Sequence, residues 1–185
     1  PGVLQPAEDE ASLLSKSKPI VTKLLDEATD KLLTMRVTEG RALADDLTKQ
    51  LNLIMDRMKQ IGERAPSVIE EYHQRLRARM DELLAKAELK ADESALIREV
   101  AVFAERADIS EEVTRMAGHV KQFHEIIAND NDSEPVGRTL DFLAQEMLRE
   151  ANTIGSKSND AEISRAMIEA KTAVDRIKEQ VQNAE

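Results

Sequence analysis

The polar side chains that could do chemistry concentrate between Val136 and Asp160. If this segment is a helix, one of its sides is apolar and the opposite side is polar. The polar side carries, in order along the chain, Arg138, Asp141, Gln145, Arg149 and Asn152. Such a face is either a solvated surface or a binding site.

Two further carboxylates of this segment, Glu146 and Glu150, stand four residues apart. Like charges at this spacing on a helix repel each other by roughly a few tenths of a kcal/mol. A cation held between them would turn the repulsion into attraction, so the pair is a candidate metal site. The alternative is a solvated face, on which cations such as Arg149 offset the repulsion.

A second polar group lies upstream, where Glu112, Arg115 and His119 fall on one edge of an expected apolar helix stripe. The side chain of His119 could ligate a metal or transfer a proton, because its unperturbed pKa is about 6.5. A histidine at such an edge can also be an ordinary hydrogen-bonded packing residue. Asp108, just before this helix, is better explained as its N-cap.

The segment Gly155-Ser156-Lys157-Ser158 precedes an expected helix that starts near Asn159. A helix N-terminus presents free N–H groups and a partial positive charge, which attract phosphate. With an ammonium group and two hydroxyls close by, the segment is a candidate phosphate-binding turn. An ordinary capped connection is the alternative.

The chain carries no Walker loop, dinucleotide glycine fingerprint, HExxH or GxSxG motif, so we expect no nucleotide cofactor. The remaining set of carboxylates, histidine and arginines suits cleavage of a phosphodiester bond. In such a reaction a divalent ion activates water or polarises the phosphate, and arginines stabilise the developing charge. A metal-free alternative would use His119 to activate a ribose 2′-hydroxyl.

Apolar spacing predicts only helices. From about Pro19 to Ile61 it indicates one very long helix or two in line, and Ala65-Pro66 is expected to end it before a second helix from Val68 to Leu84. Together these predict an antiparallel hairpin.

Four shorter helices are expected to follow. The first, capped by Asp92, runs to Ala107 and is apolar nearly all round, which predicts burial. The others begin near Ile109, Gly137 and Asn159. The predicted fold is therefore all-α, a long helical hairpin followed by a compact helical C-terminal domain. The expected division is a linker at 1–15, the hairpin at 16–91 and the domain at 92–185.

Composition and charge argue against several classes of protein. The 185 residues carry a formal net charge of −10, which argues against a protein that coats polyanions, and they include no cysteine for a thiolate site. No run is apolar enough for a membrane span, and no signal peptide is recognisable, so we expect a cytoplasmic protein without a membrane partner. The opening Pro1-Gly2-Val3 lacks an initiator methionine, which suggests a cut upstream.

Three runs in this order resemble the YicC/YloC family of bacterial endoribonucleases: residues 99–123, residues 137–164 and the closing IKEQVQNAE. The opening PGVL is similar to the family's segment just after its N-terminal domain. The resemblance implies an endoribonuclease that depends on a divalent metal, manganese or magnesium, that acts on RNA and that assembles as a homo-oligomer, a ring-like hexamer. Whether this part is active without the N-terminal region is left open.

The resemblance also marks residues at matching positions, and the role of each is our own hypothesis. The catalytic candidates are His119, Glu112, Arg115 and Arg149. The metal candidates are Glu146, Glu150, His119 and Asp141. The RNA-binding candidates are Arg138, Gln145, Asn152, Ser156, Lys157 and Ser158. Leu148 departs from the family pattern, which has asparagine there, and so removes one possible RNA contact.

Two other classes of function stay open at this point. A non-catalytic adaptor would bind RNA and present it to another nuclease. A structural scaffold would use only the long apolar stripes of residues 20–84.

Overall fold

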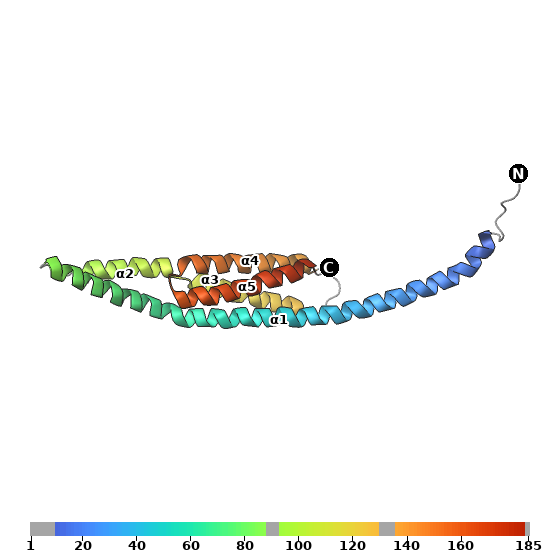
Figure 1. Cartoon of the computed structure of the whole chain (residues 1–185), viewed down its shortest axis with the longest axis horizontal. Coiled ribbons are helices and arrows are strands. Elements are labelled where there is room, and N and C mark those ends of the chain that lie inside the picture. Colours follow the sequence, from blue (N-terminus) through green and yellow to red (C-terminus); the bar gives the residue numbers. More distant parts are fainter. Residues whose placement is uncertain (1–9, 88–92, 130–135, 184–185) are drawn as a thin grey trace, which may run out of the picture. The chain divides into compact units, whose positions relative to one another are not determined.

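The computed structural model describes residues 10–87, 93–129 and 136–183. Within these ranges the chain forms five helices and no strand (Figure 1). They are α1 (Glu10–Ala87), α2 (Glu93–Ala107), α3 (Ser110–Ala128), α4 (Gly137–Lys157) and α5 (Ala161–Asn183). The predicted all-α fold is confirmed.

The chain divides into two units at a point inside α1, residues 1–45 and residues 46–185. The described part of the first unit is helix alone and begins at Glu10, so residues 10–15 of the expected linker are helical. The second unit contains the core and every candidate site residue. The expected domain boundary between residues 91 and 92 stays a prediction.

The core of the second unit forms where apolar stripes of four helices meet. Spacings of three and four residues place one side of each helix inward, and burial of that side drives the packing. α1 contributes Leu47, Leu51, Ile54, Met58 and Ile61, all of which are at most 3% exposed. α3, α4 and α5 contribute, among others, Met116, Phe123, Met147, Ile154, Val174 and Ile177, none of which has measurable exposure.

α4 is the central helix of the site, because it packs against both α3 and α5. Its apolar side, which includes Leu143, Met147 and Ile154, is buried. This packing fixes the rotation of α4 about its own axis. The rotation in turn decides which of its polar residues turn toward α3 and which turn toward solvent.

α1 continues through Pro66, where the sequence predicted that the first long helix would end. Proline lacks the N–H that a helix interior uses and costs roughly 3 kcal/mol there relative to alanine. Ile61 and Val68, on either side of it, are only 1% and 5% exposed. Their burial helps to offset this cost, and the expected turn at Ala65-Pro66 is therefore wrong.

The chain reverses direction between α1 and α2. The rings of Tyr72 and Phe103 stack with centroids 3.7 Å apart, and Arg77 lies 3.7 Å from Glu93. Because 72 meets 103 and 77 meets 93, the end of α1 and α2 are antiparallel. A long helical part ahead of a compact helical region is confirmed. The hairpin expected from residues 19–61 and 68–84 is wrong, because both stretches belong to α1, and the helix antiparallel to the end of α1 is α2.

α2 is not the buried helix that its sequence predicted. Of its apolar residues only Leu96 is buried, whereas Ile97 is 64% and Val102 is 41% exposed. The described contacts of α2 with the end of α1 cover one side of the helix, which leaves the other side open. Asp92, its expected cap, lies outside the described residues.

α5 starts two residues later than Asn159, and its cap is Asp160. The carboxylate of Asp160 accepts hydrogen bonds from the backbone N–H groups of Glu162 and Ile163, at 3.0 and 2.9 Å. It also accepts one from Arg64 of α1 at 2.8 Å. This residue therefore caps α5 and fastens it to α1 at the same time.

Our first prediction concerns which side of α5 faces the core. Ile177 has no exposed surface and Ile168, on the same helix, is 67% exposed. We expect Ile177→Ala to lower the free energy of unfolding by about 2–5 kcal/mol, because it leaves a cavity. Ile168→Ala should change it by less than about 0.5 kcal/mol. Urea unfolding followed by circular dichroism measures both. Similar losses of unfolding free energy in the two variants would show that the buried and exposed sides of α5 are assigned wrongly.

The Arg64–Asp160 contact makes a second prediction, on pH. The hydrogen bond from Arg64 lowers the pKa of Asp160 below its usual 3.8, and it outweighs the opposing effect of burial. A carboxyl group whose pKa is lowered by folding stabilises the fold above its unfolded pKa, and this contribution is lost as the pH falls through the folded pKa. Asp160→Asn retains a capping side chain but not the charge. We therefore expect it to be less stable than wild type at neutral pH.

The difference should shrink as the pH is lowered to about 3 and below. Urea unfolding at both pH values measures it. Asp175→Asn, an exposed position on the same helix, is the matched control and should differ little from wild type at either pH. A deficit in Asp160→Asn that is equal at both pH values would assign the effect to the cap alone.

Candidate functional site

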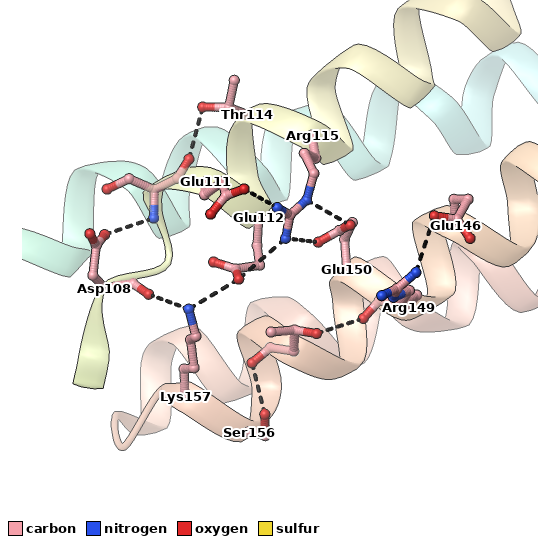
Figure 2. A network of polar contacts seen from close by, with 12 residues as sticks. Asp108, Glu111, Glu112, Thr114, Arg115, Glu146, Arg149, Glu150, Ser156 and Lys157 are labelled. Atoms are coloured by element: carbon pink, nitrogen blue, oxygen red, sulfur yellow. Dashed lines mark hydrogen bonds and ion pairs between the residues drawn. The ribbon is translucent and has the colours of Figure 1, made fainter. Parts of the chain in front are cut away.

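Two carboxylates are buried where α3 packs against α4 (Figure 2). Glu112 of α3 is 4% exposed and Glu150 of α4 is 3% exposed, and they are the buried charged residues of the described chain. Carboxylates are rarely buried unless cations or hydrogen-bond donors compensate them. A fully solvated face is thus wrong for Glu150.

Arg115 of α3 holds Glu150 with a two-pronged hydrogen bond. Its Nε donates to Oε1 of Glu150 at 2.8 Å and its Nη2 donates to Oε2 at 3.0 Å. The same guanidinium contacts Glu111, and its Nη2 lies 3.4 Å from Oε1 of Glu112. The hydrogen bond to Glu150 raises the pKa of Arg115 above its ordinary value. The sequence predicted that Arg115 lies near the site, but it did not predict Glu150 as its partner.

Lys157 lies in the last turn of α4, which ends at this residue. Its ammonium group donates to Oε1 of Glu112 at 3.0 Å and to the backbone carbonyl of Asp108 at 2.9 Å. The segment expected as a free phosphate-binding turn before α5 is therefore helical through residue 157, and its cation is engaged within the chain. A role of Lys157 in RNA binding stays a prediction.

Burial raises the pKa of Glu112, but the hydrogen bond from Lys157, a backbone hydrogen bond and the charges of Lys157 and Arg115 together lower it by more. The net pKa lies below the ordinary value, so Glu112 is ionised at neutral pH. Its Oε2 atom is buried and has no hydrogen-bond partner among the described residues. The two cations thus compensate the charge of Glu112 at one oxygen only.

His119, Glu146 and Glu150 form a group that could hold a metal ion. One donor atom from each residue, an imidazole nitrogen and two carboxylate oxygens, lies within 4.8 Å of the other two. His119 and Glu146 are partly exposed, whereas Glu150 is buried. Carboxylate oxygens suit Mg²⁺ and Mn²⁺, and imidazole suits transition metals. The structure brings together three of the four residues that the sequence assigned to a metal.

The residues present fit a divalent cation. Arg115 occupies one direction on each oxygen of Glu150, but a carboxylate oxygen offers two lone pairs, so acceptor capacity remains. The side chain of Glu146 is 27% exposed, which leaves the group open to solvent on that side. Asp141, the fourth candidate, lies outside this group and accepts hydrogen bonds from Gln145 and Gln182, at 2.8 and 3.3 Å.

The open side of the group is lined by Arg149. Its side chain is 75% exposed, and its guanidinium lies 3.8 Å from Glu146. Arg138 and Gln145, on the same side of α4, are exposed as well. Asn152, the next turn along, accepts a hydrogen bond from Lys171 of α5 at 3.0 Å.

Lys171 is a residue that the sequence did not single out. Only the packing of α5 on α4 places it beside Asn152, and no local pattern indicates this. The two serine candidates lie further from the group. Ser156 donates to the carbonyl of Thr153 at 2.9 Å, and the Oγ atom of Ser158 is buried without a hydrogen-bond partner in the described chain.

Among the helices that the structure describes, none has a stretch both long and apolar enough to cross a membrane.

Comparison with known proteins identifies the family of this chain. The family described as endoribonuclease YicC-like, C-terminal, matches residues 61–185, which include every candidate residue named above. A protein named probable endoribonuclease YicC from Clostridioides difficile (strain 630) is 38% identical over 178 residues, which are 96% of this chain and 58% of that protein.

A second relative, also named probable endoribonuclease YicC, comes from Haemophilus influenzae. It is 32% identical over 185 residues, which are 100% of this chain and 61% of that protein. The chain therefore spans about three-fifths of the length of these curated relatives. Because the family's C-terminal region matches more than half of the chain, this chain belongs to the YicC-like endoribonuclease family.

Proposed function

We propose that this chain is the catalytic part of a metal-dependent endoribonuclease that cleaves phosphodiester bonds in RNA. The observation that carries the proposal is the meeting of His119, Glu146 and Glu150 within 4.8 Å. Family membership supports the reaction class, since the relatives are named probable endoribonucleases.

The three residues would hold a divalent cation, Mn²⁺ or Mg²⁺. When bound, such an ion polarises a phosphate oxygen and lowers the pKa of a coordinated water. Glu146 and Glu150 supply the negative charge that attracts the ion. His119 adds a nitrogen donor from the facing helix.

RNA would approach from the open side of the group. The exposed guanidinium of Arg149 beside Glu146 is placed to donate to a phosphate oxygen. This polar surface extends along α4 and α5 through four further residues: Arg138, Gln145, Asn152 and Lys171. Because the whole chain carries a net charge of −10, attraction of RNA has to be local to such a surface.

We further propose that the protein works as a homo-oligomer, with the hexamer as the number that the resemblance implies. Residues 10–45 of α1 support self-association, because large apolar side chains are exposed there. Among them are Leu14 at 67%, Ile20 at 62% and Leu25 at 62% exposure. Apolar surface of this extent on one helix is typical of an interaction site.

A cleavage assay tests the proposed reaction. The wild-type chain and a longer form with the region that its relatives add are incubated with RNA in Mn²⁺, in Mg²⁺ and in EDTA. We expect metal-dependent cleavage that EDTA abolishes. Glu146→Gln should lower the rate on the order of 100-fold while the helical content is retained, because it removes a charged ligand. Glu179→Gln, an exposed acid of α5, is the control and should cleave at the wild-type rate.

Two results would contradict this reading, and each points to an alternative. Cleavage in EDTA that leaves 2′,3′-cyclic phosphate ends would assign the reaction to His119 without a metal. Salt-sensitive RNA binding without turnover in any metal would instead support the adaptor function.

Light scattering tests the proposed assembly. We expect the wild-type chain to have a mass several times that of one copy. Leu25→Glu should lower this mass severalfold, because it places a charge within the exposed apolar surface of α1. Lys23→Gln, an exposed position on the opposite side of the helix from Leu25, should leave it unchanged. A wild-type mass of one copy would contradict self-association of this chain.

A further inference from the structure

An unbroken series of polar contacts connects the end of α4 to the candidate metal group (Figure 2). It begins at the backbone carbonyl of Asp108, passes through Lys157 to Glu112, continues to Arg115 and ends at Glu150. Cations and carboxylates alternate along it. Of its four side chains, the carboxylates Glu112 and Glu150 are buried, whereas Lys157 and Arg115 are 36% and 41% exposed.

We propose that Arg115 and Lys157 are positioning residues, which hold the buried carboxylates of Glu150 and Glu112 and act on the metal group through Glu150 instead of contacting RNA. This inference rests on the proposed function, because it assigns Glu150 to the metal. It changes the roles that the sequence suggested, in which Arg115 was catalytic and Lys157 bound RNA.

The hydrogen bonds of Arg115 support a positioning role. Its guanidinium donates to carboxylates of Glu111, Glu112 and Glu150, so most of its five N–H groups have a partner within the chain. A phosphate that accepted more than the one remaining N–H would have to displace one of these carboxylates. Arg149 differs, since its side chain is 75% exposed and the one described contact of its guanidinium is a 3.8 Å ion pair.

The geometry of the Arg115–Glu150 contact explains how the arginine acts at a distance. Two parallel hydrogen bonds fix the plane of the Glu150 carboxylate as well as its position. The direction of the remaining lone pairs toward His119 and Glu146 is then set in advance. Partners that orient a metal ligand in this way usually change metal affinity by about 10–100-fold when they are replaced.

Lys157 is further from the metal group than Arg115, because Glu112 lies between these two cations in the series. Its side chain is 36% exposed, yet its ammonium group contacts Oε1 of Glu112 and the carbonyl of Asp108. It thereby ties the last turn of α4 to the start of α3 and compensates the charge of Glu112, the neighbour of Arg115. Loss of Lys157 should affect the metal group less than loss of the Arg115 fork.

Manganese binding by the chain itself tests the proposal. Isothermal titration with Mn²⁺ is carried out on wild type, Arg115→Lys, Lys157→Gln and Arg149→Gln, with circular dichroism to verify folding. Arg115→Lys keeps the charge but loses the fork, so we expect its Mn²⁺ affinity to fall by about 10–100-fold. Lys157→Gln should lower it a few-fold, and Arg149→Gln should leave it within about twofold of wild type.

RNA binding in EDTA is the complementary measurement, because it needs neither metal nor turnover. A residue that contacts phosphate reduces the salt slope of RNA affinity by about one when it is replaced. We expect this for Arg149→Gln but not for Lys157→Gln; Arg115→Lys keeps its positive charge, so it is tested by Mn²⁺ binding alone. Lys157→Gln keeps the test decisive if Arg115→Lys does not fold.

The outcomes separate this proposal from the proposed function. If wild type binds Mn²⁺ and neither Arg115→Lys nor Lys157→Gln weakens it, the positioning role is overturned and the metal site stands. A reduced salt slope in Lys157→Gln would likewise overturn the positioning role for that residue and restore its RNA contact. If wild type binds no Mn²⁺, both the metal site and the positioning role are overturned.

Discussion

The forked hydrogen bond between Arg115 and Glu150 is the interaction on which the site depends. It joins α3 to α4 and supplies a cation and two hydrogen-bond donors to a carboxylate that is only 3% exposed. Without a cation of suitable geometry, a buried carboxylate is strongly unfavourable. A lysine could supply the charge but not the fork, because its donors do not lie in one plane.

The helix that carries Glu150 also contributes to the core. The apolar side of α4 packs between α3 and α5, and Ala151 and Ile154, close to Glu150 along the chain, are buried with it. Any rotation of α4 would expose apolar surface and break the Arg115 contact together. Core packing and site geometry therefore constrain the same helix, which explains how a polar cluster can be held at the edge of an apolar core.

α1 shows a different division of roles along one helix. Its residues from Leu47 to Val68 complete the core of the second unit, and Arg64 fastens the start of α5 through Asp160. Its residues before Asp46 expose apolar side chains to solvent. The family match begins at residue 61, inside this helix, so the part of α1 that is most buried is not limited to the matched region.

Much of the site was predictable because helical periodicity is local. Glu146 and Glu150 share a face by their spacing alone, and the edge position of His119 follows from the apolar stripe beside it. That these residues of two helices meet within 4.8 Å is a different matter. It depends on how far α3 and α4 rotate and slide against each other, which no single stripe specifies.

The difference between local patterns and contacts between helices also explains why two predictions were not met. Pro66 was expected to end a helix because its local cost is large, but tertiary burial of Ile61 and Val68 opposes that cost. Lys157 looked free because its partners, Glu112 and the Asp108 carbonyl, are at least 45 residues away in sequence. By itself the sequence determined that the chain is helical and which residue types could bind a metal and RNA. Only the tertiary structure decided which charges are buried and which partner each one has, because burial and ion pairing arise between helices.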